Sequence, residues 1–450
     1  MSDQLPGWLI ELCKHINASG GKAFLVGGCV RDRLLGYPIK DYDIEVYALP
    51  SEQLREVLEK HGKVNTVGEH FAVYKLKPDA EPACEIDVSL PRRESKRGSG
   101  HRGFIIQGDP WMAFQEAASR RDFTINAILQ DPLSGTIVDP CQGISDLDKR
   151  ELRAVNANTF KDDSLRVLRA AQLSSRYRLK IAGETKILCQ GISLKDIPRE
   201  RVWEELKKLL LLSSCPSLGF NYLLELGVIE QLFPMLYELQ SSLIGKSPYP
   251  VEPAWNYVLA SLDRGKKFSE KLSEPEKISV LISIIGTRLC DENLLSFLDA
   301  LGLHTYQGYH VRAQIIKLSK LHLLPYKTFH QFQKQDLSDF VLRRIARVSD
   351  LRLVICLSKA LYLDASERIS TWLEEKSGLA RQLEPPVLRG HHILEMGVPT
   401  GPRVGKLLRQ IYEYQIEGRV KSIEEAEKLV ADLLFKRSLI SNSESFQGSG

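Results

Sequence analysis

The chain has 450 residues, of which 43% are hydrophobic and 26% are charged, and its formal net charge is +4. At roughly 100–200 residues per domain, this length predicts two to four domains, and the composition excludes wholesale disorder and collagen-like chains. The eight cysteines lie singly without a CxxC pair, which predicts reduced thiols rather than a zinc ribbon. No apolar stretch is long enough to span a membrane and no signal peptide is recognisable, so we expect a soluble, cytoplasmic protein.

The first 150 residues mix helical and strand periodicities. Apolar spacing predicts helices over 8–16 and 30–35, and β-prone runs predict strands over 23–26, 44–47, 71–76 and 86–90. Residues 91–110 carry five Lys and Arg among several glycines, which predicts a mobile, cationic loop.

Beyond about residue 160 the pattern changes to amphipathic helices, such as 165–177 and 202–212, and stays helical to about 434. The last ten residues, 441–450, are rich in Ser, Asn and Gly and are predicted to be a disordered end. The expected fold class is therefore α+β, an N-terminal mixed sheet with helices followed by an all-α remainder.

A short apolar strand runs into Gly27 and Gly28 and then into a helix that carries Arg31. Such a turn lets backbone amides approach a phosphate closely, although a paired glycine also occurs in ordinary tight turns. The motif indicates a phosphate contact at Gly28 and Arg31 if other features support it.

Two carboxylates, Asp41 and Asp43, enter the strand predicted over 44–47. Residues i and i+2 of a strand point to the same side, so this pair is able to hold Mg²⁺ together with substrate phosphates. The alternative is a solvated edge strand. A third carboxylate, Asp87, lies between apolar neighbours in a later strand and needs a partner or a metal, with Glu85 on the same face as its competitor.

Further motifs follow in order at residues 118–128, 139–147, 162–170 and 200–206. Together with the paired glycines and the three carboxylates, they resemble the class II tRNA nucleotidyltransferases (CCA-adding enzymes) and bacterial poly(A) polymerases, within the DNA polymerase β-like nucleotidyltransferase superfamily. The resemblance covers residues 22–212. It implies a nucleotidyltransferase palm or head over 1–150, a helical neck over 151–215, a helical body over 216–384 and a tRNA-binding tail over 385–440.

The resemblance also implies a reaction, in which metal ions at Asp41 and Asp43 activate the tRNA 3′-hydroxyl for attack on the α-phosphate of CTP or ATP. The two-metal scheme suits this chemistry, and Mg²⁺ is the expected cofactor. Asp87 is the expected third catalytic carboxylate. Gly28 and Arg31 match positions that contact the triphosphate. Arg121 matches a nucleotide-binding arginine, and its neighbour Arg120 is the alternative.

In this family the protein itself reads the incoming base through an acidic residue and an arginine on a neck helix. Asp163 and Arg166 match this pair, and their i, i+3 spacing places them on one helical face. Arg169, one further step along, matches another nucleotide contact. The neck motif that includes Arg201 is expected to pack and orient the helices.

The tRNA 3′ end is the expected partner, and no membrane or protein partner is readable. Arg97 and Arg102 in the cationic loop, and Arg403 and Lys406 on a basic helix face near the C-terminus, are candidate tRNA contacts. The body resembles a degenerate HD-type phosphohydrolase module, because Asn256 stands where a metal-ligating His is expected.

The resemblance favours full CCA addition, because the loop over 91–110 corresponds to one that enzymes adding only CC lack. An enzyme that adds only the terminal A is the close alternative. A poly(A) polymerase is a second one, although residues 68–71 read Gly-Glu-His-Phe where that group is expected to carry Gly-Arg-Arg-Phe. A catalytically inactive RNA-binding protein would have no need of the paired carboxylates.

Overall fold

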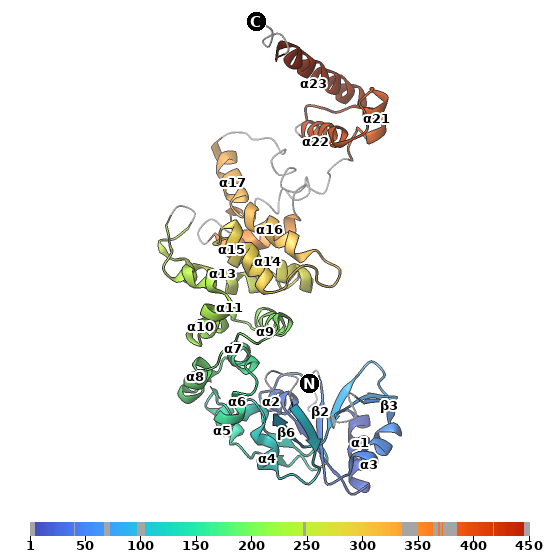
Figure 1. Ribbon diagram of the computed structural model, residues 1–450, viewed down its shortest axis with the longest axis vertical. Coiled ribbons are helices and arrows are strands. Elements are labelled where there is room, and N and C mark those ends of the chain that lie inside the picture. Colours follow the sequence, from blue (N-terminus) through green and yellow to red (C-terminus); the bar gives the residue numbers. More distant parts are fainter. Residues whose placement is uncertain are drawn as a thin grey trace. The chain divides into compact units, whose positions relative to one another are not determined.

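The computed structural model describes residues 5–39, 41–66, 73–96, 104–245, 249–334, 350–362, 368–369, 371, 385–416 and 418–444. By its internal contacts the chain divides into two compact units, residues 1–237 with 300–302, and residues 238–299 with 303–450. Figure 1 labels their elements. The finer division into head, neck, body and tail remains a prediction.

A mixed seven-stranded sheet organises the head in the described part of the first unit. Its order is β3-β4-β5-β2-β1-β8-β9, and β2 with β5 is its parallel pair, while the other neighbours run antiparallel. The strands are β1 (Lys22–Val26), β2 (Asp43–Tyr47), β3 (Gly62–Thr66), β4 (Val73–Pro78), β5 (Ile86–Ser89), β8 (Leu129–Gln130) and β9 (Ile137–Val138).

The head helices connect these strands and cover the sheet. They are α1 (Gly7–Ala18), α2 (Gly28–Leu34), α3 (Ser51–Glu59), α4 (Phe114–Ser119), α5 (Gly143–Asp148) and α6 (Ala157–Phe160), with a 3-10 turn η1 (Thr124–Asn126). The predicted helices over 8–16 and 30–35 and the strands over 23–26, 44–47 and 86–90 are confirmed within a few residues. The strand predicted over 71–76 is confirmed from residue 73 onward, because 71 and 72 lie outside the described residues.

One face of the central strands carries both apolar and acidic side chains. Phe24 and Val26 of β1 and Tyr47 of β2 pack with Met112 and Ala117 in one buried apolar cluster. Because side chains alternate along a strand, Asp43 and Glu45 project from β2 on the same face as Tyr47. This face of the sheet, on the side of α4, carries the acidic residues.

The cationic segment 91–110 forms a hairpin rather than the loop that its composition predicts. Strands β6 (Arg92–Lys96) and β7 (Phe104–Gly108) pair antiparallel in a sheet of their own. The loop prediction was wrong for these residues because the charged sequence of β6 lacks alternating apolar residues, while its pairing partner β7 supplies the β-prone side chains. Residues 97–103, between the strands, lie outside the described residues.

The neck predicted over 151–215 contains α7 (Leu165–Tyr177), which packs against α9 (Arg199–Leu212) and against α10 (Pro216–Glu225) beyond it. A Cβ at Gly219 of α10 would lie 2.6 Å from Leu209 Cδ1 and 2.9 Å from Ser175 Cβ, so the close approach of these helices requires glycine there. The unit also contains the parallel pair β10 (Glu151–Leu152) and β11 (Lys180–Ile181), and helices α8 (Gly183–Gln190), α11 (Val228–Leu232) and α12 (Pro234–Tyr237). The predicted helices over 165–177 and 202–212 are confirmed.

The second unit is helical apart from one short strand pair in its described residues. Within it, α14 packs on α16 and α13 packs on α14 and α19. Its elements are η2 (Glu238–Gln240), β12 (Leu243–Ile244), β13 (Glu252–Pro253), α13 (Ala254–Phe268), α14 (Glu274–Gly286), α15 (Asp291–Ala300), α16 (Val311–Leu321), α17 (Leu324–Lys334), α19 (Leu351–Leu361), α21 (Gly390–Glu395), α22 (Pro402–Ile416) and α23 (Ile423–Glu444). The all-α prediction beyond residue 160 therefore missed the two-residue strands, which are too short to show a period in the sequence.

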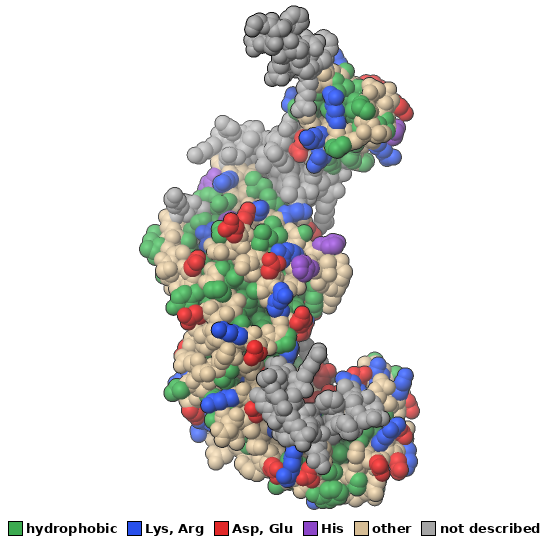
Figure 2. All heavy atoms as spheres, viewed as in Figure 1, with side chains coloured by type: hydrophobic (Ala, Val, Ile, Leu, Met, Phe, Trp, Pro, Cys, Tyr) green, Lys and Arg blue, Asp and Glu red, His purple; other side chains and the backbone are tan. Residues whose placement is uncertain are grey.

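Helices α21, α22 and α23 share an apolar cluster that includes Ile393, Leu407 and Ile411. Arg403 and Lys406 lie exposed on α22, whereas Leu407 is buried. Lys and Arg side chains are visible on the surface of this C-terminal segment (Figure 2). Throughout the described residues, the helices are too short or too polar to cross a membrane.

Candidate active site

The parallel pairing of β2 with β5 places Asp43 opposite Asp87. Burial raises the pKa of the Asp43 carboxyl, and the nearby charges of Asp87 and Asp41 raise it further. A carboxylate that is destabilised by desolvation and by like charges is stabilised when a cation binds beside it. The register thus joins the two carboxylates that the sequence places 44 residues apart at one position of the sheet.

Asp87 also contacts a lysine from the adjacent strand β4. Lys75 Nζ donates to Asp87 Oδ1 at 3.2 Å and to Glu85 Oε1 at 3.0 Å. Lys75 lies directly opposite Asp87 in the β4–β5 register, whereas Glu85 precedes β5. Of the two candidates for the third carboxylate, Asp87 is therefore the one in register with Asp43.

Asp41 lies just before β2 and is exposed. Among the residues that the structure describes, no three His, Cys, Asp or Glu side chains are gathered closely enough to hold a metal ion. The site instead offers the carboxylates of Asp43 and Asp87, with Asp41 nearby. Two carboxylates fit a hard cation such as Mg²⁺, which usually takes its remaining ligands from water and substrate phosphates.

The paired-glycine turn passes directly beside this carboxylate pair. Gly27 has φ +74°, and a Cβ there would lie 3.4 Å from Arg121 Nη1 and 3.6 Å from Asp43 Oδ2. A side chain would therefore fill the space between the guanidinium and the carboxylate, so glycine keeps this space open. Gly28 follows as the first residue of α2.

Arg31, predicted to contact a triphosphate, is held by partners inside the protein. It is 5% exposed, and its guanidinium donates to Asp32 Oδ1 at 2.9 and 2.7 Å, to Asn126 Oδ1 at 2.6 Å and to Tyr177 Oη at 2.6 Å. It also lies over the Tyr177 ring, 4.4 Å from the ring centroid. In this structure Arg31 ties the paired-glycine segment to the neck helix α7.

Glu45 is a site residue that the sequence reasoning missed. Its carboxylate is 1% exposed and accepts from Arg120 Nη2 at 2.6 Å and from Arg121 Nη2 at 3.0 Å. Although burial alone would raise the pKa of the Glu45 carboxyl, the guanidiniums of Arg121 and Arg120 hold it below its usual value. The sequence did contain a signal for Glu45: it follows Asp41 and Asp43 at the same two-residue spacing and lies between two apolar residues of the strand.

The predicted base-reading residues lie at the start of α7 and have partners within the first unit. Asp163 accepts from Arg201 of α9, with Nη1 to Oδ1 at 3.3 Å and Nη2 to Oδ2 at 3.0 Å. Arg166 donates from Nη1 to the carbonyl oxygen of Thr159 at 3.0 Å and from Nη2 to that of Arg120 at 2.5 Å. A nucleotide base would replace some of these contacts.

Arg169, one turn further along α7, forms a two-point contact with Asp122. Both Nε and Nη2 lie 2.8 Å from Asp122 Oδ2. Burial alone would raise the pKa of the Asp122 carboxyl, but Arg169 and the hydrogen bond from Asn126 hold it below its usual value. The structure thus connects the arginine motif at 120–122 to α7 through both Arg166 and Arg169.

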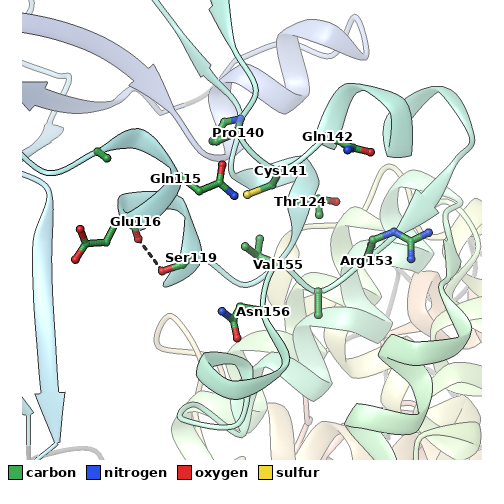
Figure 3. Close-up of a pocket in the computed structure, with 12 residues that line it drawn as sticks. Gln115, Glu116, Ser119, Thr124, Pro140, Cys141, Gln142, Arg153, Val155 and Asn156 are labelled. Carbon is green, nitrogen blue, oxygen red and sulfur yellow. Dashed lines mark hydrogen bonds between the residues drawn. The ribbon is translucent and has the colours of Figure 1, made fainter.

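Two hollows flank α4. One, of about 210 Å³, is cationic and is lined by Arg92, Arg93, Met112, Glu116, Ser119, Arg120, Thr159, Asp162 and Arg166. The other, of about 720 Å³, is formed by α4, the turn at 140–142 and the segment 153–156 (Figure 3). Its lining is mostly uncharged and includes Gln115, Cys141 and Gln142. The cationic hollow includes Arg166, whereas the larger one includes none of the predicted site residues.

The remaining predicted residues are not seen in contact with this cluster in the described part of the chain. Arg97 and Arg102 lie outside the described residues. Arg403 and Lys406 are exposed on α22 in the second unit. Asn256, which stands in place of a metal-ligating His, is exposed on α13.

Comparison with known proteins identifies the class of the head. Residues 23–153 match the family model described as "Poly A polymerase head domain". Residues 184–239 match the model described as "Probable RNA and SrmB- binding site of polymerase A". The sheet with its carboxylate pair thus belongs to a polymerase-A-type head.

Comparison with relatives by sequence identity assigns the chain to a family within this class. The CCA-adding enzyme of Pseudomonas putida is 33% identical over 294 residues, which cover 62% of this chain and 76% of the relative. The multifunctional CCA protein of Mannheimia succiniciproducens is 39% identical over 225 residues, 48% of this chain and 51% of the relative. The chain belongs to this family of CCA-adding enzymes and multifunctional CCA proteins. It spans about half the length of the multifunctional relatives it matches.

Solved structures support the fold. The Bacillus stearothermophilus CCA-adding enzyme in complex with CTP superposes with a TM-score of 0.68 at 20% identity, covering 96% of this chain and 99% of that one. The Thermotoga maritima CCA-adding enzyme complexed with tRNA gives 0.63 at 19% identity, covering 96% and 97%. The expected α+β head followed by a mostly helical remainder is confirmed.

Proposed function

We propose that this chain adds the 3′-terminal CCA to tRNA from CTP and ATP. The observation that carries the proposal is the register of Asp43 opposite Asp87, next to the open turn at Gly27 and the guanidinium of Arg121. Such a site suits a reaction in which a triphosphate and a divalent cation must meet. Membership of the family of CCA-adding enzymes supports tRNA as the acceptor.

In the proposed reaction, the 3′-oxygen of tRNA forms a bond to the α-phosphorus of the nucleotide, and the bond to the bridging oxygen of the β-phosphate breaks. Pyrophosphate leaves with that bonding electron pair, and the proton of the attacking hydroxyl passes to water. Asp41 and Asp43, the predicted metal ligands, would hold the divalent cation together with Asp87, which lies opposite Asp43. When bound, Mg²⁺ lowers the pKa of the attacking hydroxyl and neutralises charge on the triphosphate.

The arginines of the first unit orient the triphosphate. Arg121 lies beside Asp43 and Gly27. Its planar guanidinium can donate two parallel hydrogen bonds to phosphate oxygens, which an ammonium cannot do. Gly28 allows the backbone to approach the phosphates. Arg31 also contacts the triphosphate, by giving up part of its contact with Asp32. Arg169 of α7 is a further nucleotide contact.

Asp163 and Arg166 select the base. A carboxylate accepts from the exocyclic amino group that both C and A carry, and a guanidinium donates to ring nitrogens or carbonyls. U and G lack that arrangement of donors and acceptors on the same edge. Because no nucleic-acid template is needed, the neck helix α7 itself serves as the selecting surface.

The experiment is incorporation of labelled CTP and ATP, separately and together, on tRNA transcripts that end at the discriminator base, at C or at CC. A non-tRNA RNA serves as the control acceptor. We expect addition of C, C and a single A on tRNA, and no addition to the control. Addition of ATP to the CC-ended transcript alone would make the protein an A-adding enzyme, and long A tracts on the control would make it a poly(A) polymerase.

A further inference from the structure

We propose that Glu45 is a positioning residue, which orients Arg121 toward the triphosphate and links the metal-binding strand β2 to the base-reading helix α7. This inference rests on the proposed function. It concerns a residue that touches neither the cation nor the nucleotide in the proposed reaction, and that acts through two arginines.

The first step of the argument is the position of Glu45. It follows Asp43 by two residues on β2, so the two side chains project from the same face of the strand. Asp43 lies at the edge of the site and is partly exposed, whereas Glu45 lies deeper and is 1% exposed. One strand therefore presents a cation ligand at the surface of the site and a buried anion behind it.

The second step is the way Glu45 divides its two oxygens. Oε1 accepts from Arg120 Nη2 at 2.6 Å, and Oε2 accepts from Arg121 Nη2 at 3.0 Å. The guanidinium of Arg121 then presents Nη1 toward the Asn126 carbonyl oxygen, 3.4 Å away, and toward the space beside Gly27. Glu45 thus holds one edge of Arg121 and leaves the other directed toward the turn at Gly27 and Asp43.

The third step is charge. Two guanidiniums so close together repel each other, and burial with the Arg121 charge holds the pKa of Arg120 below its usual value despite Glu45. One carboxylate between two guanidiniums leaves a net positive charge of one, which attracts a polyphosphate without leaving the arginines unpaired. Without the Glu45 charge, the two guanidiniums would repel each other, and Arg121 would lose the contact that holds its Nη2 edge.

The fourth step is the connection to α7. Glu45 contacts the side chain of Arg120. The backbone carbonyl oxygen of Arg120 in turn accepts a hydrogen bond from Arg166 Nη2 at 2.5 Å. Glu45, Arg120 and Arg166 therefore form one chain of contacts from β2 to the predicted base-reading arginine. A displacement of the 120–121 turn changes both the phosphate contact and the base contact.

The test is Glu45→Gln, which keeps the shape of the side chain and removes its charge. Loss of a buried, charge-assisted pair predicts a rise in KM for both CTP and ATP of about 10- to 100-fold, together with greater misincorporation of UTP and GTP. The affinity for tRNA should not change. Kinetics of Arg121→Ala and of the double variant should show that the second substitution adds little once the first is present, because Glu45 acts through Arg121.

Glu276→Gln is the matched control. Glu276 is 6% exposed and pairs with the exposed side chain of Arg352 in the second unit, so Glu276→Gln measures the cost of neutralising a buried, arginine-paired carboxylate outside the proposed site. Glu45→Asp is a second variant in case Glu45→Gln does not fold: it keeps the charge but spans the arginines poorly, and should raise KM by a smaller factor.

The inference is overturned if Glu45→Gln or Glu45→Asp lowers the melting temperature as Glu276→Gln does while KM and base selection stay at wild-type values. It is also overturned if the effects of Glu45→Gln and Arg121→Ala multiply. Failure of the proposed function would look different, because the wild-type protein itself would then not extend tRNA with C or A.

Discussion

Arg201 and Asp163 form a two-point ion pair between α9 and the residue two positions before α7, with N–O distances of 3.3 and 3.0 Å. Asp163 also accepts from the backbone N–H of Leu165 at 3.1 Å. The orientation of the Asp163 carboxylate is therefore fixed by Arg201 of α9 and by the backbone of Leu165, the first residue of α7. If Asp163 selects the base, its selectivity depends on a residue that never contacts the nucleotide.

Replacing Arg201 by Lys should relax base selection. An ammonium keeps the charge but cannot form the parallel two-point contact, so Asp163 gains rotational freedom. We expect the ratio of CTP to UTP incorporation to fall by about 5- to 50-fold, corresponding to roughly 1–2 kcal/mol of lost orientation. Competition assays with mixed labelled nucleotides measure this ratio. Direct removal of the selecting group, in Asp163→Ala or Arg166→Ala, should relax it at least as far, and an unchanged ratio in all three variants would contradict the assignment.

Asp43→Asn should abolish nucleotide incorporation while making the metal-free protein more stable. The loss of a charged cation ligand predicts a fall in kcat of about 1,000-fold or more. Because burial and the charges of Asp87 and Asp41 raise the pKa of Asp43 in the folded state, the ionised carboxylate destabilises the fold at neutral pH, and Asn removes this effect. Melting in chelator measures the second outcome, and a lower melting temperature would contradict the electrostatic argument. Retention of tRNA on a filter should persist.

The same shift predicts how pH and Mg²⁺ act together. The folded-state pKa of Asp43 lies above its unfolded value, so the protein binds this proton more tightly when folded, and its metal-free stability falls as pH rises through the interval between the two values. Cation binding requires the ionised form. Apparent Mg²⁺ affinity should therefore weaken as pH falls toward this interval, and saturating Mg²⁺ should move the acid limb of the rate profile to lower pH. An acid limb that does not move with Mg²⁺ would exclude Asp43 as its source.

Gly219→Ala should destabilise the first unit. The added methyl would lie 2.6 Å from Leu209 Cδ1 and 2.9 Å from Ser175 Cβ, where α10 meets α9 and α7. Overpacking of this kind costs about 1–3 kcal/mol. Gly183→Ala in α8 of the same unit is the control, because nothing lies within 4 Å of its added methyl. Chemical denaturation should separate the two variants, and equal midpoints would mean that the helices can move apart at no cost.

Arg403 and Lys406 should contribute to tRNA binding mainly through phosphate contacts. Both are exposed on α22, whereas Leu407 and Ile411 of the same helix are buried. The double substitution to Ala should weaken tRNA binding about equally for all tRNA sequences and reduce the slope of log affinity against log salt by about 1–2. Fluorescence titrations at several salt concentrations test this. A weakened affinity with an unchanged slope would indicate that the loss is structural.

The local elements of the head were predictable because their signals are periodic. The strand at 44–47 and the helix at 165–177 each repeat an apolar pattern at the spacing of their own structure. The acidic pair at Asp41 and Asp43 stood out against that pattern. The register of Asp43 with Asp87 was not predictable, since it depends on which strands become neighbours, and β2 and β5 are separated in the chain by α3, β3 and β4.

The residues missed by sequence reasoning are those whose role depends on a partner. Glu45 reads as an interruption of an apolar strand until the arginines at 120 and 121 are placed against it. The triphosphate contact of Arg31 stays a prediction, whereas its contacts with Asn126 and Tyr177, which lie far along the chain, were not predicted. The strand at 92–96 has four charged residues of five and pairs with residues 104–108. In each case the deciding contact joins residues that are far apart in the sequence.

The ammonium of Lys75, 3.2 Å from Asp87, gives the site a tethered counterion. This lysine partly balances the charge of the carboxylates. A divalent ion that binds Asp87 through Oδ1 would displace the ammonium, so metal loading at this oxygen would be an exchange rather than a simple capture. Such an exchange disfavours monovalent ions, which offer no gain in charge over the lysine they would replace.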